Sequence, residues 1–162
     1  MRDIEHIARR SVFVFNIQKN MGLVLGLING MVLIALSALH FFWATGGTWG
    51  FDNALPTNKA GNRILNPNRF DCTFVGLGLL AFAFLFFIRI GLMELELPFW
   101  LVYHSIWVIA AIFILRSIGD FRYVGFFKKL HDNNFADLDT KYYSPLCLAI
   151  GIISILVQLC LP

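Results

Sequence analysis

Four long apolar blocks organise the chain. They cover residues 22–44, 72–88, 98–115 and 145–161, and charged residues stand between them. The hydrocarbon core of a membrane is about 30 Å thick, so a helix that rises about 1.5 Å per residue needs roughly 20 apolar residues to cross it. Backbone polar groups in lipid must pair within their own segment, and no alternating ten-residue pattern indicates a β-barrel. The pattern therefore predicts an all-α fold, an integral membrane four-helix bundle.

The composition agrees with this class. Of the 162 residues 58% are hydrophobic and seventeen are phenylalanine, and the mean hydropathy is +0.70. A soluble domain of this size contains less apolar surface than that. The net charge of +3 suits anchoring at anionic head groups, and the absence of a clustered basic face excludes a nucleic-acid partner.

The first twenty residues form a separate segment. Ile4, Ile7 and Ile17 recur at partly helical spacing among basic residues, which leaves two alternatives open, a short interfacial helix and a solvated tail. No cleavage pattern of a signal peptide precedes the first apolar block, so that block is expected to be a span. The predicted organisation is residues 1–20 as tail or interfacial helix and residues 21–162 as the transmembrane domain.

Four spans place the first and third loops on the same face of the membrane. That face also receives most polar residues at the helix ends, namely His40, Trp43, Asp71, Thr73, Arg116, Asp120, Ser144 and Cys147. The two long loops carry eight Lys and Arg residues, against five on the opposite side. The positive-inside rule therefore favours cytoplasmic long loops.

Both long loops are expected to be structured. In the first loop, Gly46, Gly47 and Gly50 permit tight turns, while Trp49 suits the head-group layer and Pro56 restricts the chain. The pattern favours an ordered connector that caps the bundle, with a lid over a pocket as the alternative. The third loop is expected to be partly helical.

The stretch RSIGDFRYVGFFKK, residues 116–129, follows the third block directly. If the helix continues one turn past Arg116, Asp120 faces the same way and the two side chains form an ion pair. Arg116 alone is also explained by a side chain that reaches up to the head groups. Structural pairing and a role in ligand binding or catalysis both remain open for Asp120.

Small and polar residues inside the spans predict close packing. Gly22, Gly26 and Gly30 follow a small-xxx-small pattern. Two polar stripes are expected to face inward: Asn29 with His40, and the series Cys147, Gly151, Ser154 and Gln158. His104 lies near the middle of the third block, where an interhelical hydrogen bond is the favoured interpretation.

Familiar catalytic and metal-binding signals are missing. The four histidines lack metal-ligand spacing, and the three cysteines form no CxxC pair. Cys72 and Cys147 both begin spans on the polar face, but buried free thiols are the favoured interpretation. No phosphate-binding, dinucleotide-binding or nucleophile-elbow motif is present. The sequence therefore predicts no metal and no cofactor.

Four blocks of sequence together resemble a known family. HFFWATGGTWGFDNALPTN (40–58), LNPNRFDCTFVGLGLL (65–80), LRSIGDFRYVGFFKK (115–129) and FADLDTKYYSPLCL (135–148) are similar to the recurring blocks of the bacterial membrane protein family called domain of unknown function 3995. The resemblance implies a four-helix protein of a bacterial inner membrane, without a known activity. The family blocks fall on His40, Trp43, Gly46, Gly47, Trp49, Pro56, Arg116, Gly119, Asp120, Gly125, Asp139, Thr140, Ser144 and Pro145.

Three functional hypotheses follow. The first is a binding or accessory protein that receives a lipid-like or other small lipophilic molecule, because a polar rim surrounds an aromatic bundle. Its candidate ligand-binding residues are His40, Trp43, Trp49, Arg116, Asp120 and Asp139. The second is a membrane-embedded enzyme with His40 as general acid or base, oriented by Asp120 or Asp139. The third is a small transporter, acting as a homo-oligomer, with His104 as its mid-membrane ionisable residue.

Overall fold

The computed structural model describes residues 2–56, 63–120, 123–129 and 134–161, and these are mostly helical with no β-strand among them. The long helices are α1 (Arg2–Ala44), α2 (Arg69–Arg89), α3 (Phe99–Ile118) and α5 (Ser144–Cys160). Three short elements lie in the long loops: the 3-10 turn η1 (Asp52–Ala54), the helix α4 (Asn134–Leu138) and the π-helical turn η2 (Asp139–Tyr143). The predicted all-α four-helix bundle is confirmed, as is a partly helical third loop. The described part of the first loop contains η1, and residues 57–62 of that loop lie outside the described residues.

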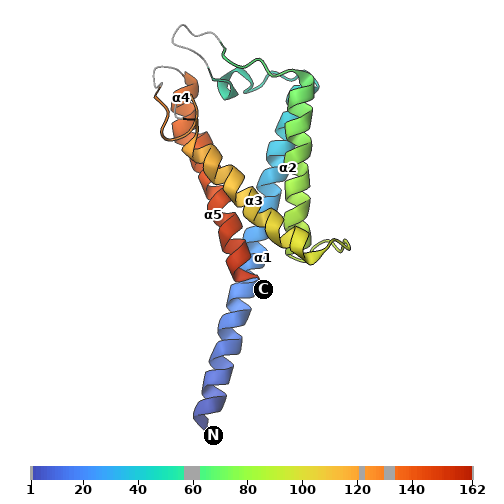
Figure 1. Cartoon of the computed structure of the whole chain (residues 1–162), viewed down its shortest axis with the longest axis vertical. Helices are drawn as coiled ribbons and strands as arrows, with labels where there is room; N and C mark the ends of the chain where they lie inside the picture. The colour runs from blue at the N-terminus through green and yellow to red at the C-terminus, as the bar shows by residue number, and fades with distance from the viewer. Residues whose placement is uncertain (1, 57–62, 121–122, 130–133, 162) are drawn as a thin grey trace.

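Four segments are long and apolar enough to cross a membrane: Val12–Ala44, Arg69–Arg89, Phe99–Ile118 and Asn134–Cys160. The first helix is longer than its apolar block because no glycine or proline interrupts residues 2–21. Its N-terminal half extends past the end of the bundle, beyond the C-terminus (Figure 1). Residues 2–20 are therefore helical and continuous with the first span, and a position at the membrane interface stays a prediction.

The core of the bundle lies where α1, α2, α3 and α5 meet. Its fully buried apolar side chains include Leu33, Phe86, Ile106, Ile109 and Val157. α1 packs along α2 and α5, and α3 packs along α5. Figure 1 shows α2 and α3 diverging from the loop that joins them, so these two helices separate toward the face that carries both long loops.

Glycines and buried polar groups hold these helices together, as the sequence predicts. A Cβ atom on Gly26 would lie 2.4 Å from Ile90 Cγ2, and one on Gly151 would lie 2.6 Å from Ile114 Cγ1. Asn29 Nδ2 donates to Ile150 O and to Ser154 Oγ, both at 3.1 Å. Since lipid offers no hydrophobic drive between helices, such close packing and interhelical hydrogen bonds stabilise the bundle.

Two expectations about the third helix are wrong. α3 ends at Ile118, where Gly119 adopts a φ of 90°, so the helix does not bring Asp120 beneath Arg116. His104 is exposed, and its Nδ1 donates to the carbonyl of Trp100, one turn earlier on the same helix, at 2.6 Å. It is therefore not an interhelical histidine.

We expect Gly151→Leu to lower the free energy of unfolding by about 1–3 kcal/mol, the range for overpacking a close-packed interior. The added side chain would collide with α3, because a Cβ on Gly151 would also lie 3.3 Å from Ala110 O. The thermal unfolding midpoint of the protein in mild detergent measures this loss.

Gly78→Leu is the matched control for this substitution. It lies within α2, and nothing stands within 4 Å of a Cβ there, so its unfolding midpoint should stay equal or rise. Equal midpoints for the two variants would show that α3 and α5 do not depend on this contact.

Candidate functional site

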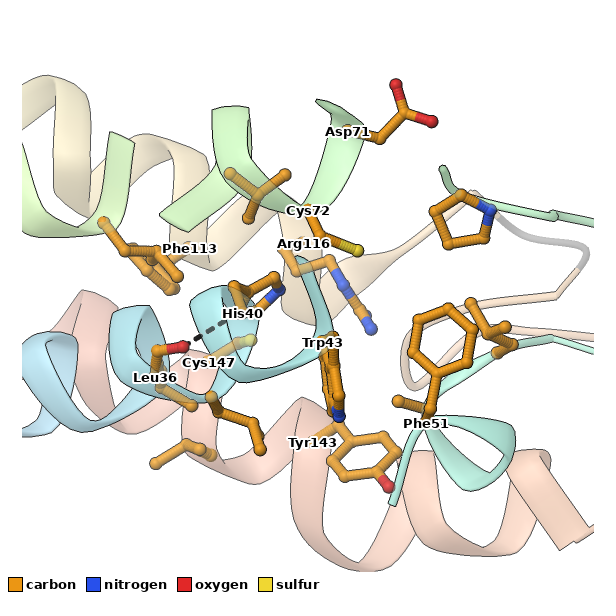
Figure 2. A pocket seen from close by; sticks show the side chains of 17 residues that line it. Leu36, His40, Trp43, Phe51, Asp71, Cys72, Phe113, Arg116, Tyr143 and Cys147 are labelled. Carbon is orange, nitrogen blue, oxygen red and sulfur yellow. Dashed lines mark hydrogen bonds between the residues drawn. The ribbon is translucent and has the colours of Figure 1, made fainter. Parts of the chain in front are cut away.

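A cavity of about 390 Å³ lies at the face of the bundle that carries the long loops. Figure 2 shows side chains converging on it from α1, α2, α3, α5 and the first loop. Its apolar lining comes from Leu36, Leu39, Phe51, Ala54, Leu55, Pro67, Val75, Leu79, Phe113 and Leu146. Its polar or aromatic lining comes from His40, Trp43, Asp71, Cys72, Arg116, Tyr143 and Cys147. The separated ends of α2 and α3 thus form two walls of one shared space.

His40 and Trp43 form the α1 wall. His40 Nδ1 lies 2.8 Å from Leu36 O, and because a carbonyl only accepts, Nδ1 is the donor of this hydrogen bond. The His40 ring meets the edge of Trp43 at a centroid distance of 5.0 Å. Trp43 Nε1 in turn donates to Trp49 O at 2.9 Å. Trp43 therefore joins the cavity wall to the first loop.

Arg116 joins the cavity to a buried ion cluster. Its Nη2 donates to Asp139 Oδ1 at 3.2 Å. Its Nη1 is buried and has no hydrogen-bond partner in the part of the chain that the structure describes. The Arg116 side chain is 36% exposed, and Figure 2 shows it extending toward the side of the cavity that Trp43 and Phe51 line.

Asp139 is the centre of this cluster, and its side chain is 0% exposed. Its Oδ2 accepts from Lys128 Nζ at 3.0 Å and from Gly125 N at 2.8 Å. Lys128 is buried too and also donates to Thr140 Oγ1 and to Gly125 O. One carboxylate thus holds two cations, Arg116 from the third helix and Lys128 from the third loop.

Local backbone geometry makes this cluster. Gly119 and Gly125 both have a φ of 90°, and a Cβ on Gly125 would lie 2.3 Å from Ile118 O. Only glycine permits this conformation and this approach, so the third loop folds back onto the end of α3. Asp139 is the first residue of the π-helical turn η2. Short π-helical turns are frequent at functional sites.

Trp49 and Asp120 lie outside the cavity lining. The side chain of Trp49 is 76% exposed, and the residue contributes its carbonyl to Trp43. Asp120 is exposed, and its Oδ1 accepts from Tyr123 N at 2.7 Å and Val124 N at 2.9 Å, which is a local turn. Of the six predicted residues, the structure brings His40, Trp43 and Arg116 to the cavity and places Asp139 behind Arg116.

Three residues that the sequence did not single out, Lys128, Tyr143 and Asn53, also take part. Lys128 is followed by Lys129, an exposed residue of the same type, so only the fold distinguishes the two. Asn53 accepts from Asn134 Nδ2 at 2.9 Å, and its carbonyl accepts from Tyr143 Oη at 3.3 Å. These bonds tie the first loop to the third, so the first loop covers the cavity as well as connecting two helices.

The described residues contain no assembled catalytic group around His40. Its ring contacts are the Leu36 carbonyl and the Trp43 ring, whereas the oxygens of Asp139 bind Arg116, Lys128 and a backbone amide. No three His, Cys, Asp or Glu side chains within the described ranges gather to hold a metal ion. Cys72 and Cys147 line the cavity as free thiols.

Comparison with protein families now identifies the relatives of this chain. A family model described as "Protein of unknown function (DUF3995)" matches residues 33–154. The chain belongs to this family. The matched DUF3995 region contains all the residues that line the cavity of this chain and all members of the ion cluster. It leaves out the N-terminal extension of α1. Comparisons with curated proteins and with solved structures found no match.

We expect Asp139→Asn to lower the free energy of unfolding by about 3 kcal/mol. The change leaves Lys128 buried without a counter-charge, and breaking a buried pair from one side costs about this much. Thermal unfolding in detergent measures the change. The double variant Asp139→Asn with Lys128→Met should recover part of the loss, because it removes the buried charge as well.

Asp137→Asn serves as the control, since Asp137 is an exposed carboxylate two residues earlier in the same segment. An unfolding midpoint for Asp139→Asn equal to that of Asp137→Asn would contradict a central role for the ion cluster.

Proposed function

We propose that this multi-pass membrane protein binds a small, lipid-like ligand in the cavity beneath its first loop. The supporting observation is a cavity of about 390 Å³ with apolar walls and a few polar lining groups, among them the Arg116 side chain. Small-molecule sites are typically hollows of about 300–1,000 Å³ with apolar walls and a few convergent polar groups. The cavity has both properties.

The walls favour an apolar body. Leu36 and Leu39 from α1, Val75 and Leu79 from α2 and Phe113 from α3 all line the space. Burial of apolar ligand surface against such side chains contributes about 25 cal/mol per Å² removed from water. A ligand acceptor at the Arg116 guanidinium, which is partly exposed and lines the cavity, would add a hydrogen bond to a charged group.

The position of the cavity favours a ligand that comes from the bilayer. Arg116 stands in the last turn of α3, where a span meets the head groups, and α2 and α3 diverge toward this level (Figure 1). We propose the bacterial inner membrane as the location, with the basic long loops in the cytoplasm. Below the cavity, Leu33 and Ile150 are buried in the apolar core, an arrangement that suits a binding site better than a transport path.

The test is to fill the cavity. Cys147 lines it from α5, and Cys147→Phe adds a ring within the space. We expect the purified variant to retain less than about a tenth of the co-purifying lipophilic molecule that the unaltered protein retains, because burying a drug-sized ligand needs most of the pocket volume. Mass spectrometry of organic extracts measures the ratio of ligand to protein.

Ala149→Phe is the control on the same helix. Ala149 is exposed and does not line the cavity, so this variant should retain the ligand fully. Equal retention by both variants, or no retained molecule in the unaltered protein, would contradict the proposed function.

A further inference from the structure

The ion cluster beside the cavity has unequal charge. Arg116 and Lys128 each carry a positive charge, and both bind the single carboxylate of Asp139. Among the described residues, this cluster therefore has one positive charge more than it has negative charges. Arg116 is its partly exposed member, so a group with one negative charge is the chemical complement of the cluster on the cavity side.

The Arg116 guanidinium shows where that negative charge belongs. Arg116 Nη2 binds Asp139 Oδ1, whereas Oδ2 accepts from Lys128 and Gly125. Arginine binds carboxylates well through two parallel donors, but here Asp139 takes only one of them. The Arg116 side chain lines the cavity and is 36% exposed, so the guanidinium keeps donor capacity that a ligand can reach.

Two carboxylates of the described loop-bearing face, Asp71 and Asp120, do not take this role. Asp71 lines the mouth of the cavity, but its Oδ2 accepts from Asn68 N at 2.9 Å in the capping box of α2. Figure 2 shows its carboxylate pointing away from Arg116. Asp120 is exposed and accepts from the backbone of Tyr123 and Val124. The other groups that line the cavity are mainly aromatic rings, thiols and alkyl chains.

We propose that the ligand is a single-chain amphiphile with one negative charge, a long-chain carboxylate, whose head group binds the Arg116 guanidinium. This inference rests on the proposed function and names its ligand class. The volume of about 390 Å³ lies at the low end of the range of about 300–1,000 Å³ for small-molecule sites. A ligand with one alkyl chain suits such a space better than a phospholipid with two.

The experiment is competition against Nile red, an uncharged dye, bound to the full-length protein in an uncharged detergent. The competitors share a twelve-carbon chain and differ in head group: dodecanoate, dodecyl phosphate, dodecanol and dodecyltrimethylammonium. A two-chain phosphatidylglycerol completes the series. We expect dodecanoate to displace the dye at a concentration at least about tenfold below that of dodecanol, because hydrogen bonds to charged groups are worth about this factor.

Arg116→Gln should abolish this difference, and its thermal unfolding midpoint in detergent shows that the variant is folded. Asp139 then keeps Lys128 as its counter-charge. The matched control is Arg89→Gln, which removes an arginine from the last turn of α2, where Arg89 donates to Gln158 and to Leu161 O. That variant should retain the full preference for dodecanoate.

The outcomes separate the two proposals. Equal displacement by dodecanoate and dodecanol in the unaltered protein would overturn the charge assignment and leave the proposed function intact. Tighter binding of dodecyl phosphate would move the assignment to a phosphate ester, and equally tight phosphatidylglycerol would overturn the single-chain part. Displacement by none of the competitors, together with unchanged dye binding in Cys147→Phe, would overturn the proposed function itself.

Discussion

The architecture of the loop-bearing face depends on one buried carboxylate, that of Asp139. A carboxylate removed from water is stable only when cations and hydrogen-bond donors surround it. Asp139 obtains them from the end of α3, through Arg116, and from the third loop, through Lys128 and Gly125 N. The third loop is consequently held against the membrane-spanning helices, and Arg116 is held where its side chain lines the cavity.

The same carboxylate also determines how the first loop is held. Asp139 and Tyr143 are the first and last residues of η2. Tyr143 Oη donates to Asn53 O, and Tyr143 itself lines the cavity. Fixing one end of this π-helical turn through ion pairs therefore positions the tyrosine that meets the first loop at the other end. The ion cluster, the covering loop and the cavity are parts of one arrangement, linked by the five consecutive residues of η2.

The sequence predicts the spans much better than the site. Span length depends on apolar content alone, so four helices could be expected without any knowledge of packing. The ion pair between Arg116 and Asp139 could not be predicted in this way. It depends on the turn at Gly119, which ends α3 and moves Asp120 out of its expected helical position. Asp137 and Asp139 differ by two residues in sequence, yet one is exposed and the other is buried. Only the π-helical turn and its cations distinguish them.

Two arginines show why position in a helix does not by itself define a site. Arg89 and Arg116 both lie in the last turn of a membrane-spanning helix, where a cation complements the helix dipole. Arg89 donates to Gln158 and to the carbonyl of Leu161, and these bonds close its end of the bundle around the terminus of α5. Arg116 lies where α2 and α3 have separated, so its side chain borders a cavity and not the end of a neighbouring helix. The divergence of two helices thus leaves the Arg116 side chain at the cavity.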